Sequence, residues 1–309
     1  MRSTFHSVKK MLILMGKGHN RFQKEFTQYF LLIVLTLVSC EPKKPITPEV
    51  AYKENVAYLK SQAIENWNKR SNKKNAAVST FFLEKAISLE PNNLELKLLL
   101  SRAYHFEAYY IESDPALKDS LFLAGAQLAV SIVRGSEAFI DAMETTQSDS
   151  MVKVTEAIAL VEKEYLDALY WWATNMGRYL SGKSVRDRLE YRELGESLMH
   201  RVFALDPDYF YGGPNRFFGA LYARLPGVEL SQSEEYFQKA IDRFPDYLGT
   251  YVLRARFLHT KAGDREKFRG DLTHVINADP SNIPDVMPEN LYEQKIAEAL
   301  LADEDMLFE

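Results

Sequence analysis

Apolar residues recur along most of the chain with the spacing of an amphipathic helix. They stand three and four residues apart, as at Phe237, Ala240, Ile241 and Phe244, which places them on one face of a helix. No stretch shows the strict alternation of apolar and polar residues that is typical of a half-buried strand. From about residue 52 onward, the pattern therefore predicts an all-α protein.

Four segments share one shape, an amphipathic helix that ends on a proline. Each segment has a small or β-branched residue five positions before its proline, and these pairs are Ala86 and Pro91, Val202 and Pro207, Ala240 and Pro245, and Val275 and Pro280. A small residue allows two helices to approach closely, and proline stops the second helix. The pattern predicts tetratricopeptide-like helical hairpin repeats in one superhelical domain, residues 52–309.

Less regular helices are predicted between these segments, at residues 93–111, 116–134, 151–160, 163–181 and 187–204, with a polar loop at 144–150. Asp114 before Pro115 and Asp264 before Arg265 are expected to cap helices, and Ser231 with Glu234 has the spacing of a capping box. We expect no second apolar run of membrane-spanning length after residue 40.

The N-terminal segment has the features of a secretory signal. Basic residues dominate positions 1–28, an apolar run of about ten residues follows from Tyr29 to Val38, and Cys40 comes directly after Ser39. The sequence Leu37-Val38-Ser39-Cys40 resembles the lipobox of bacterial lipoproteins, which implies cleavage before Cys40 and acylation of that cysteine. We predict a signal peptide at 1–39 and a lipidated tether at 40–51. The alternative is an ordinary signal peptide with a chance cysteine.

Charge and cysteine content narrow the function classes. Residues 1–39 contain 6 of the 38 basic and 1 of the 43 acidic residues, which leaves 32 basic and 42 acidic residues, a net charge of −10. That balance argues against a nucleic-acid partner, which needs a basic surface. Cys40 is the only cysteine, so no internal disulfide can form. Lipid on Cys40 would hold the protein to the inner or the outer membrane.

Catalytic and metal-binding patterns are not recognisable after residue 40. The four histidines there do not stand at metal-ligand spacing, and no phosphate-binding glycine loop or nucleophile elbow is present. We therefore predict no cofactor, no metal and no enzyme. A hydrolase acting on cell-wall material would need two carboxylates across a cleft, and the sequence nominates no such pair.

Two segments differ from ordinary repeat sequence. In residues 168–183, neighbouring Trp171 and Trp172 diverge by about 100° on a helix, so one of them is expected to face a cavity, a groove or a partner, with Asn175 one turn away. The alternative is that different neighbouring helices cover both rings.

The second segment runs from Asp208 to Val228. Paired glycines allow a tight turn there, and Pro214 suits the first turn of a helix. Arg216 then lies near a helix start, where the helix dipole disfavours a positive charge. It is expected to bind an anionic group or, alternatively, to form a structural ion pair.

These residues together resemble the TatT component family of lipoproteins associated with TRAP (tripartite ATP-independent periplasmic) transporters. The resemblance is strongest over residues 160–280. It implies tetratricopeptide-like hairpins, a homotrimer with a central pore, and the periplasmic solute-binding protein as partner. The candidate residues for a ligand or partner groove are Trp171, Trp172, Asn175, Tyr209, Tyr211, Gly212, Gly213, Pro214, Arg216, Phe217, Leu225, Pro226 and Gly227.

The predicted function is that of a lipid-anchored, periplasm-facing scaffold. It would dock the solute-binding protein of a TRAP transporter and bind or pass a small hydrophobic or organic-acid ligand. The alternative is a structural or assembly lipoprotein of the envelope that is unrelated to transport.

Overall fold

The computed structural model describes residues 48–146 and 150–309 of the 309-residue chain. The chain divides into two units, residues 1–53 and 54–309, and the arrangement below concerns the second. The predicted signal peptide, Cys40 and the tether up to residue 47 lie outside the described residues. Residues 48–51 were expected to belong to the tether. In the structure they are helical, as the first described helix begins at Pro48.

The described residues form helices and short turns without a strand, which confirms the predicted all-α class. The longer helices are α3 (Pro48–Trp67), α4 (Lys73–Leu89), α5 (Leu94–Phe106), α6 (Pro115–Val133), α7 (Glu137–Thr145), α8 (Ser150–Leu160), α9 (Leu166–Ser181), α10 (Val185–Glu190), α11 (Arg192–Leu205), α12 (Tyr209–Arg224), α13 (Leu230–Arg243), α16 (Arg265–Asn277) and α17 (Met287–Ala302). The shorter elements are η1 (Glu107–Ile111), η2 (Lys163–Tyr165), α14 (Gly249–Leu253), η3 (Arg254–His259), α15 (Thr260–Ala262), η4 (Pro280–Asn282), η5 (Pro284–Val286) and α18 (Glu304–Leu307).

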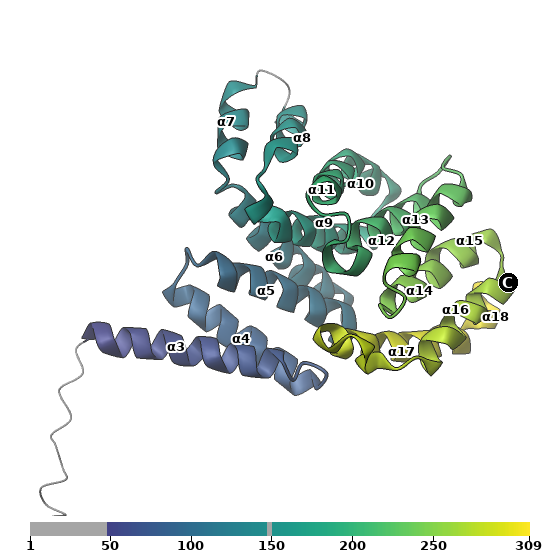
Figure 1. The fold of residues 1–309 in the computed structure, drawn as a ribbon, viewed down its shortest axis with the longest axis horizontal. Coiled ribbons are helices and arrows are strands. Elements are labelled where there is room, and N and C mark those ends of the chain that lie inside the picture. The colour runs from purple at the N-terminus through teal and green to yellow at the C-terminus, as the bar shows by residue number, and fades with distance from the viewer. Residues whose placement is uncertain (1–47, 147–149) are drawn as a thin grey trace, which may run out of the picture. The chain divides into compact units, whose positions relative to one another are not determined.

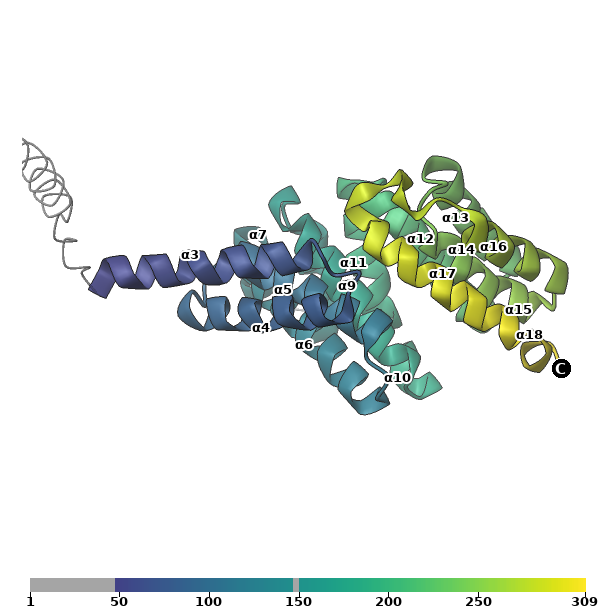
Figure 2. The same cartoon turned by 90° about the horizontal axis from the view of Figure 1, so that it is seen from below.

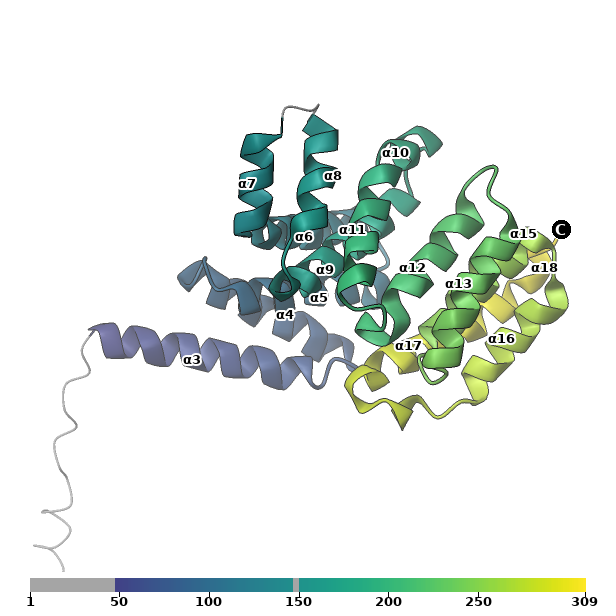
Figure 3. The ribbon, with the colours of Figure 1, turned by 45° about the horizontal axis from the view of Figure 1, so that its top comes forward.

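Helices that follow one another in the chain mostly pack on one another. The contacting pairs include α4 with α5, α5 with α6, α11 with α12, α12 with α13, and α16 with α17 (Figure 1). Helices α7 and α8 also lie side by side (Figure 3), and α9 packs on both α6 and α11. The tetratricopeptide-like geometry of these pairs stays a prediction.

The four segments that end on proline behave as expected. Ala86, Val202, Ala240 and Val275 are all fully buried between helices. Each helix ends two or three residues before its proline, at Leu89, Leu205, Arg243 and Asn277. Small buried side chains and proline stops therefore define these four helix ends, as the sequence predicts.

Capping follows the sequence in part. The Asp114 carboxylate accepts from the backbone N–H groups of Ala116 and Leu117, and Asp264 accepts from that of Lys267. The predicted capping box is wrong. Helix α13 begins at Leu230, before Ser231, and Glu234 instead forms an ion pair with Lys267 at 3.0 Å.

Three expectations about the middle of the chain are also wrong. Helix α7 is not among the predicted helices. The Ser136 hydroxyl caps it by accepting from the Phe139 N–H at 3.1 Å. The expected polar loop begins inside this helix, and residues 147–149 of it lie outside the described residues. In addition, α6 is long and apolar enough to cross a membrane, by length and composition only. It packs on α5 and α9, with Phe122, Ala126 and Ala129 buried, as in a core helix.

A buried ion pair joins the turn between α3 and α4 to helix α17. Arg70, in the turn after α3, donates to the Glu289 carboxylate of α17 at 2.6 and 3.3 Å and to the backbone oxygen of Asp285. Arg102 of α5 adds a second ion pair to Glu289 at 3.1 Å. The start of α17 accordingly lies beside the turn between α3 and α4 (Figures 1 and 2).

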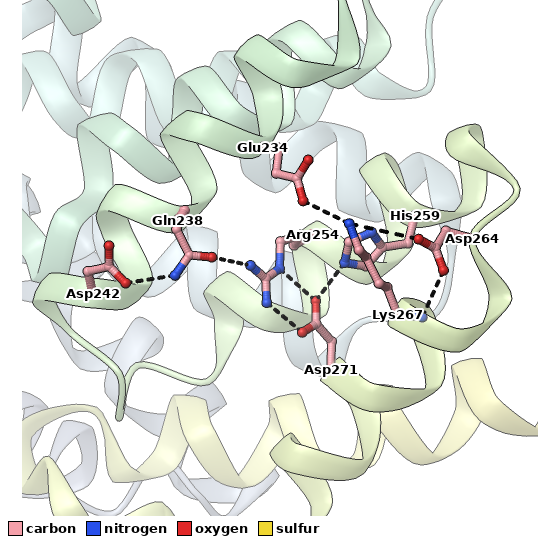
Figure 4. A network of polar contacts seen from close by, with 8 residues as sticks. All are labelled: Glu234, Gln238, Asp242, Arg254, His259, Asp264, Lys267 and Asp271. Carbon is pink, nitrogen blue, oxygen red and sulfur yellow. Dashed lines mark hydrogen bonds and ion pairs between the residues drawn. The ribbon is translucent and has the colours of Figure 1, made fainter.

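A second polar network joins α13, η3 and α16 (Figure 4). Arg254 donates to both carboxylate oxygens of Asp271 at 2.6 and 2.8 Å and to the side-chain oxygen of Gln238 at 3.0 Å. His259 contacts the same carboxylate at 3.1 Å. Because every charge in this network has a partner, we assign it a structural role in the packing of the C-terminal helices.

Candidate functional site

The segment before Pro214 forms a turn of left-handed backbone. Phe210, Tyr211 and Gly212 have φ angles of 46°, 56° and 72°, and right-handed helix resumes after them. Glycine adopts this conformation freely, but each of the two aromatic residues costs about 1–2 kcal/mol there. Pro214 therefore lies in the first turn of the right-handed part of α12, as predicted from its fixed φ.

Arg216 holds this turn from inside the protein. Its guanidinium donates to the carbonyl oxygens of Tyr211 at 2.9 Å and Phe210 at 3.1 Å, and to the Tyr170 hydroxyl at 3.1 Å. It also lies 4.1 Å from the ring centroid of Tyr247. The side chain is 5% exposed. The left-handed carbonyls thus compensate a positive charge that the dipole of α12 disfavours.

A cavity of about 50 Å³ lies next to Arg216, and we call it the central cavity. Aromatic and charged side chains form most of its wall, including Tyr109, Tyr110, Trp171, Phe210, Tyr247, Arg102, Arg178, Arg216, Glu289 and Glu293. A second space of about 80 Å³, the side cavity, shares Tyr170, Thr174, Arg178, Arg216 and Leu253 with it and extends to Arg224 and Phe257. The two spaces therefore meet at Arg178 and Arg216.

A larger pocket of about 330 Å³ lies on the other side of Phe210, and we call it the large pocket. Phe210 and Arg102 line both this pocket and the central cavity, so they form the wall between them. The rest of its lining consists of Tyr209, Tyr211, Phe244, Val286 and three aspartates. The left-handed turn consequently places Phe210 between the central cavity and the large pocket, with Tyr209 and Tyr211 on the side of the large pocket.

The charges around the two cavities do not cancel. In the described part of the chain, no carboxylate lies within 4.0 Å of Arg178, Arg216 or Arg224 to form an ion pair. Burial, together with repulsion from Arg178, Arg188 and Arg256, lowers the pKa of Arg224 to about 10. An anion between these groups would relieve both effects.

Glu293 is the carboxylate that faces the central cavity together with Glu289. One of its oxygens accepts from the Tyr110 hydroxyl at 2.7 Å, and the other is buried without a hydrogen-bond partner. Burial raises the pKa of Glu293, which favours its neutral form. Glu293 therefore compensates the positive charge of the arginines only weakly. Glu289 already forms ion pairs with Arg70 and Arg102.

His105 packs against Trp171 at the same cavity, with 5.3 Å between ring centroids. Burial and the nearby arginines lower the pKa of His105 to about 3, so the ring is neutral at physiological pH. Its Nδ1 faces the Asn175 side-chain oxygen at 3.2 Å, and the Asn175 amide donates to Ser101. This network fixes the ring between α5 and α9.

The structure brings some of the predicted residues together and separates others. Trp171 and Arg216 line the central cavity, Tyr209 and Tyr211 line the large pocket, and Gly213 and Phe217 line the side cavity. Leu225 and Pro226 line a fourth space at α10 and α11. The predicted residues that line none of these spaces are Trp172, Asn175, Gly212, Pro214 and Gly227.

Of the two tryptophans, Trp171 faces the central cavity, and Trp172 is buried in the main hydrophobic cluster with Leu169 and Leu198.

Four residues that line these spaces were not predicted from sequence, namely Arg102, Arg178, Arg224 and Glu293. A signal existed for two of them. Arg178 follows Trp171 by seven residues and Arg224 follows Arg216 by eight, which places each pair on one helix face.

Within the described residues, no group of three or more His, Cys, Asp or Glu side chains could hold a metal ion. The paired helices surround internal cavities lined by arginine side chains, an arrangement suited to binding. The chain belongs to the family of the TRAP transporter T-component, whose family model matches residues 82–308. This family is an accessory transporter component and not an enzyme family, and its members are periplasmic and envelope-associated. A search of curated proteins finds no match.

Proposed function

We propose that the protein is an exported lipoprotein, anchored through acylated Cys40, that docks the solute-binding protein of a TRAP transporter and binds or passes a small organic-acid or hydrophobic ligand. Family membership supports the association with a TRAP transporter. The observation that carries the ligand-binding part is the arginine-lined pair of cavities, where Arg178, Arg216 and Arg224 have no carboxylate partner among the described residues.

The predicted groove residues fit this proposal in two ways. Trp171 and Arg216 would contact a ligand in the central cavity, and Tyr209 and Tyr211 would line its approach through the large pocket. Charge-assisted hydrogen bonds from Arg216 to a carboxylate would compete with its bonds to the left-handed turn. The family resemblance further supports tetratricopeptide-like pairs and a homotrimer, which light scattering of the purified protein would test.

Docking can be tested by affinity purification of the tagged protein from gently cross-linked, detergent-solubilised membranes. We expect mass spectrometry to recover a periplasmic solute-binding protein. A matched Cys40→Ser variant should recover the same partner but leave the membrane fraction, because the acyl chains supply the anchor. Absence of any solute-binding protein, or a Cys40→Ser variant that stays membrane-bound after export and cleavage, would contradict the respective part of the proposal.

The alternative function is a structural or assembly lipoprotein of the envelope. Neighbouring genes discriminate the two functions. A TRAP solute-binding protein or permease encoded beside this gene supports transport, whereas envelope-assembly genes support the alternative.

A further inference from the structure

An apolar pocket of about 110 Å³ adjoins the arginine-lined side cavity. It lies between α9, α10, α11 and α12, and its apolar wall is formed by Leu180, Val185, Leu189, Phe217, Leu221 and Leu225. Val185 and Leu189 are 53% and 47% exposed, so the pocket reaches the protein surface at α10. We call this space the apolar pocket.

Arg224 connects the apolar pocket with the side cavity, since its side chain lines both. Its Nε donates to the backbone oxygen of Ala220 at 2.9 Å, and its guanidinium lies 4.7 Å from the Phe257 ring centroid. Neither contact neutralises its charge. Arg224 is thus a half-buried cation at the junction of a polar and an apolar space.

Two further arginines stand on either side of this junction. Arg178 lines the side cavity and lies 3.9 Å from the Tyr109 ring centroid, and Arg188 lines the apolar pocket. The Nε of Arg188 and the Tyr191 hydroxyl are buried without a hydrogen-bond partner. Buried donors of this kind are normally satisfied in folded proteins, so a ligand oxygen that enters the apolar pocket could accept from them.

We infer that Arg224, with Arg178 and Arg188 beside it, binds the carboxylate of a small monocarboxylic acid whose hydrocarbon part occupies the apolar pocket. The inference rests on the proposed function in that it names the class of ligand that this function handles. Guanidinium groups bind carboxylates through paired charge-assisted hydrogen bonds. Leucine and phenylalanine side chains provide the matching surface for the hydrocarbon part.

The volume limits the size of the acid. An engineered cavity of about 150 Å³ accepts benzene, so a pocket of about 110 Å³ encloses a branched chain of four or five carbons, and a longer chain would extend through the opening at α10 into solvent. A dicarboxylate is expected to bind less tightly, because apolar side chains form most of the wall of the apolar pocket and would desolvate its second carboxylate.

The test is isothermal titration of the exported protein, purified in lipid nanodiscs, with 4-methylpentanoate as the probe. We expect saturable binding, at least about tenfold tighter than that of 4-methylpentanamide or succinate. The amide has nearly the same shape without the charge, so this comparison needs no variant.

Variants then locate the site. Arg224→Gln and Arg178→Gln should each weaken 4-methylpentanoate binding at least about tenfold, whereas Arg224→Lys should lose less. Arg186→Gln is the matched control, because Arg186 is exposed on the same short helix as Arg188 and lines none of the four spaces. Its affinity should equal that of the unchanged protein.

Equal affinity for the acid and the amide, no binding of the acid, or full binding by both Arg224→Gln and Arg178→Gln would overturn the inference. The docking experiment is independent of this titration. Acid binding without a recovered solute-binding protein would leave the site in place and refute the docking role, and the reverse result would refute the site alone.

Discussion

At the scale of single residues, the arginines around the cavities divide into two kinds. Arg216 makes three hydrogen bonds and stabilises a strained turn, whereas Arg224 makes one bond to a carbonyl and is surrounded by other arginines. The sequence singles out Arg216 because a cation near a helix start is unusual. For Arg178 and Arg224 it offers only their spacing from Trp171 and Arg216, and for Arg102 it offers no signal, because an isolated arginine on a helix is ordinarily a solvated residue.

This division predicts opposite outcomes for the same substitution. Arg216→Met should lower the free energy of unfolding by about 2–4 kcal/mol, because the carbonyls of Phe210 and Tyr211 lose their buried donors. Arg224→Met should change it by less than about 1 kcal/mol, since relief of repulsion offsets the lost bond. Urea unfolding of the purified variants measures both. Equal losses would contradict the assignment of Arg216 to the turn.

At the scale of elements, the apolar periodicity and the proline stops predict most of the helices. Each helix buries one apolar face against its neighbours, and this face repeats along the sequence every three to four residues. Helix α7 was missed because it has only nine residues and its capping serine carries no further signal. The left-handed turn was also beyond prediction. Tyrosine and phenylalanine disfavour positive φ, and the Arg216 side chain that holds the turn is itself positioned by a bond to Tyr170, 46 residues earlier in the chain.

The contact between α12 and α9 provides a test at this scale. A Cβ atom on Gly213 would lie 2.6 Å from a ring carbon of Tyr170, so the two helices could not remain in place. Gly213→Ala should therefore lower the free energy of unfolding by about 1–3 kcal/mol.

Gly270→Ala is the control for this substitution. Gly270 lies inside α16 with nothing within 4 Å of a built Cβ, so alanine should stabilise the protein by about 0.5–1 kcal/mol. Thermal and urea unfolding would measure both variants. A neutral Gly213→Ala would show that α12 and α9 are not closely packed.

At the scale of the whole second unit, contacts between distant parts of the chain supplement those between neighbours. Glu289 accepts from Arg70 and Arg102, which precede it by 219 and 187 residues. The Tyr292 hydroxyl donates to the backbone oxygen of Ser71 at 3.2 Å. No local pattern predicts such pairs, because periodicity describes one helix at a time.

Glu289→Gln should lower the free energy of unfolding by about 3–5 kcal/mol, because Arg70 would remain buried without a counter-charge. The control is Glu235→Gln, which removes an exposed ion pair with Lys239 and should cost less than about 1 kcal/mol. Chemical denaturation followed by circular dichroism would test this difference. A loss at Glu289 no larger than at Glu235 would contradict it.

The pairing of Glu289 with Arg70 also restricts how this protein can evolve. Helical arrays whose repeats contact only their neighbours can gain or lose a unit by duplication or deletion, since the remaining interfaces are unaffected. Here an inserted pair of helices would move α17 away from the α3–α4 turn and leave Arg70, Arg102 and Glu289 without their ion pairs. Sequence change should therefore be concentrated in loops and surface positions, while the number of helices stays constant.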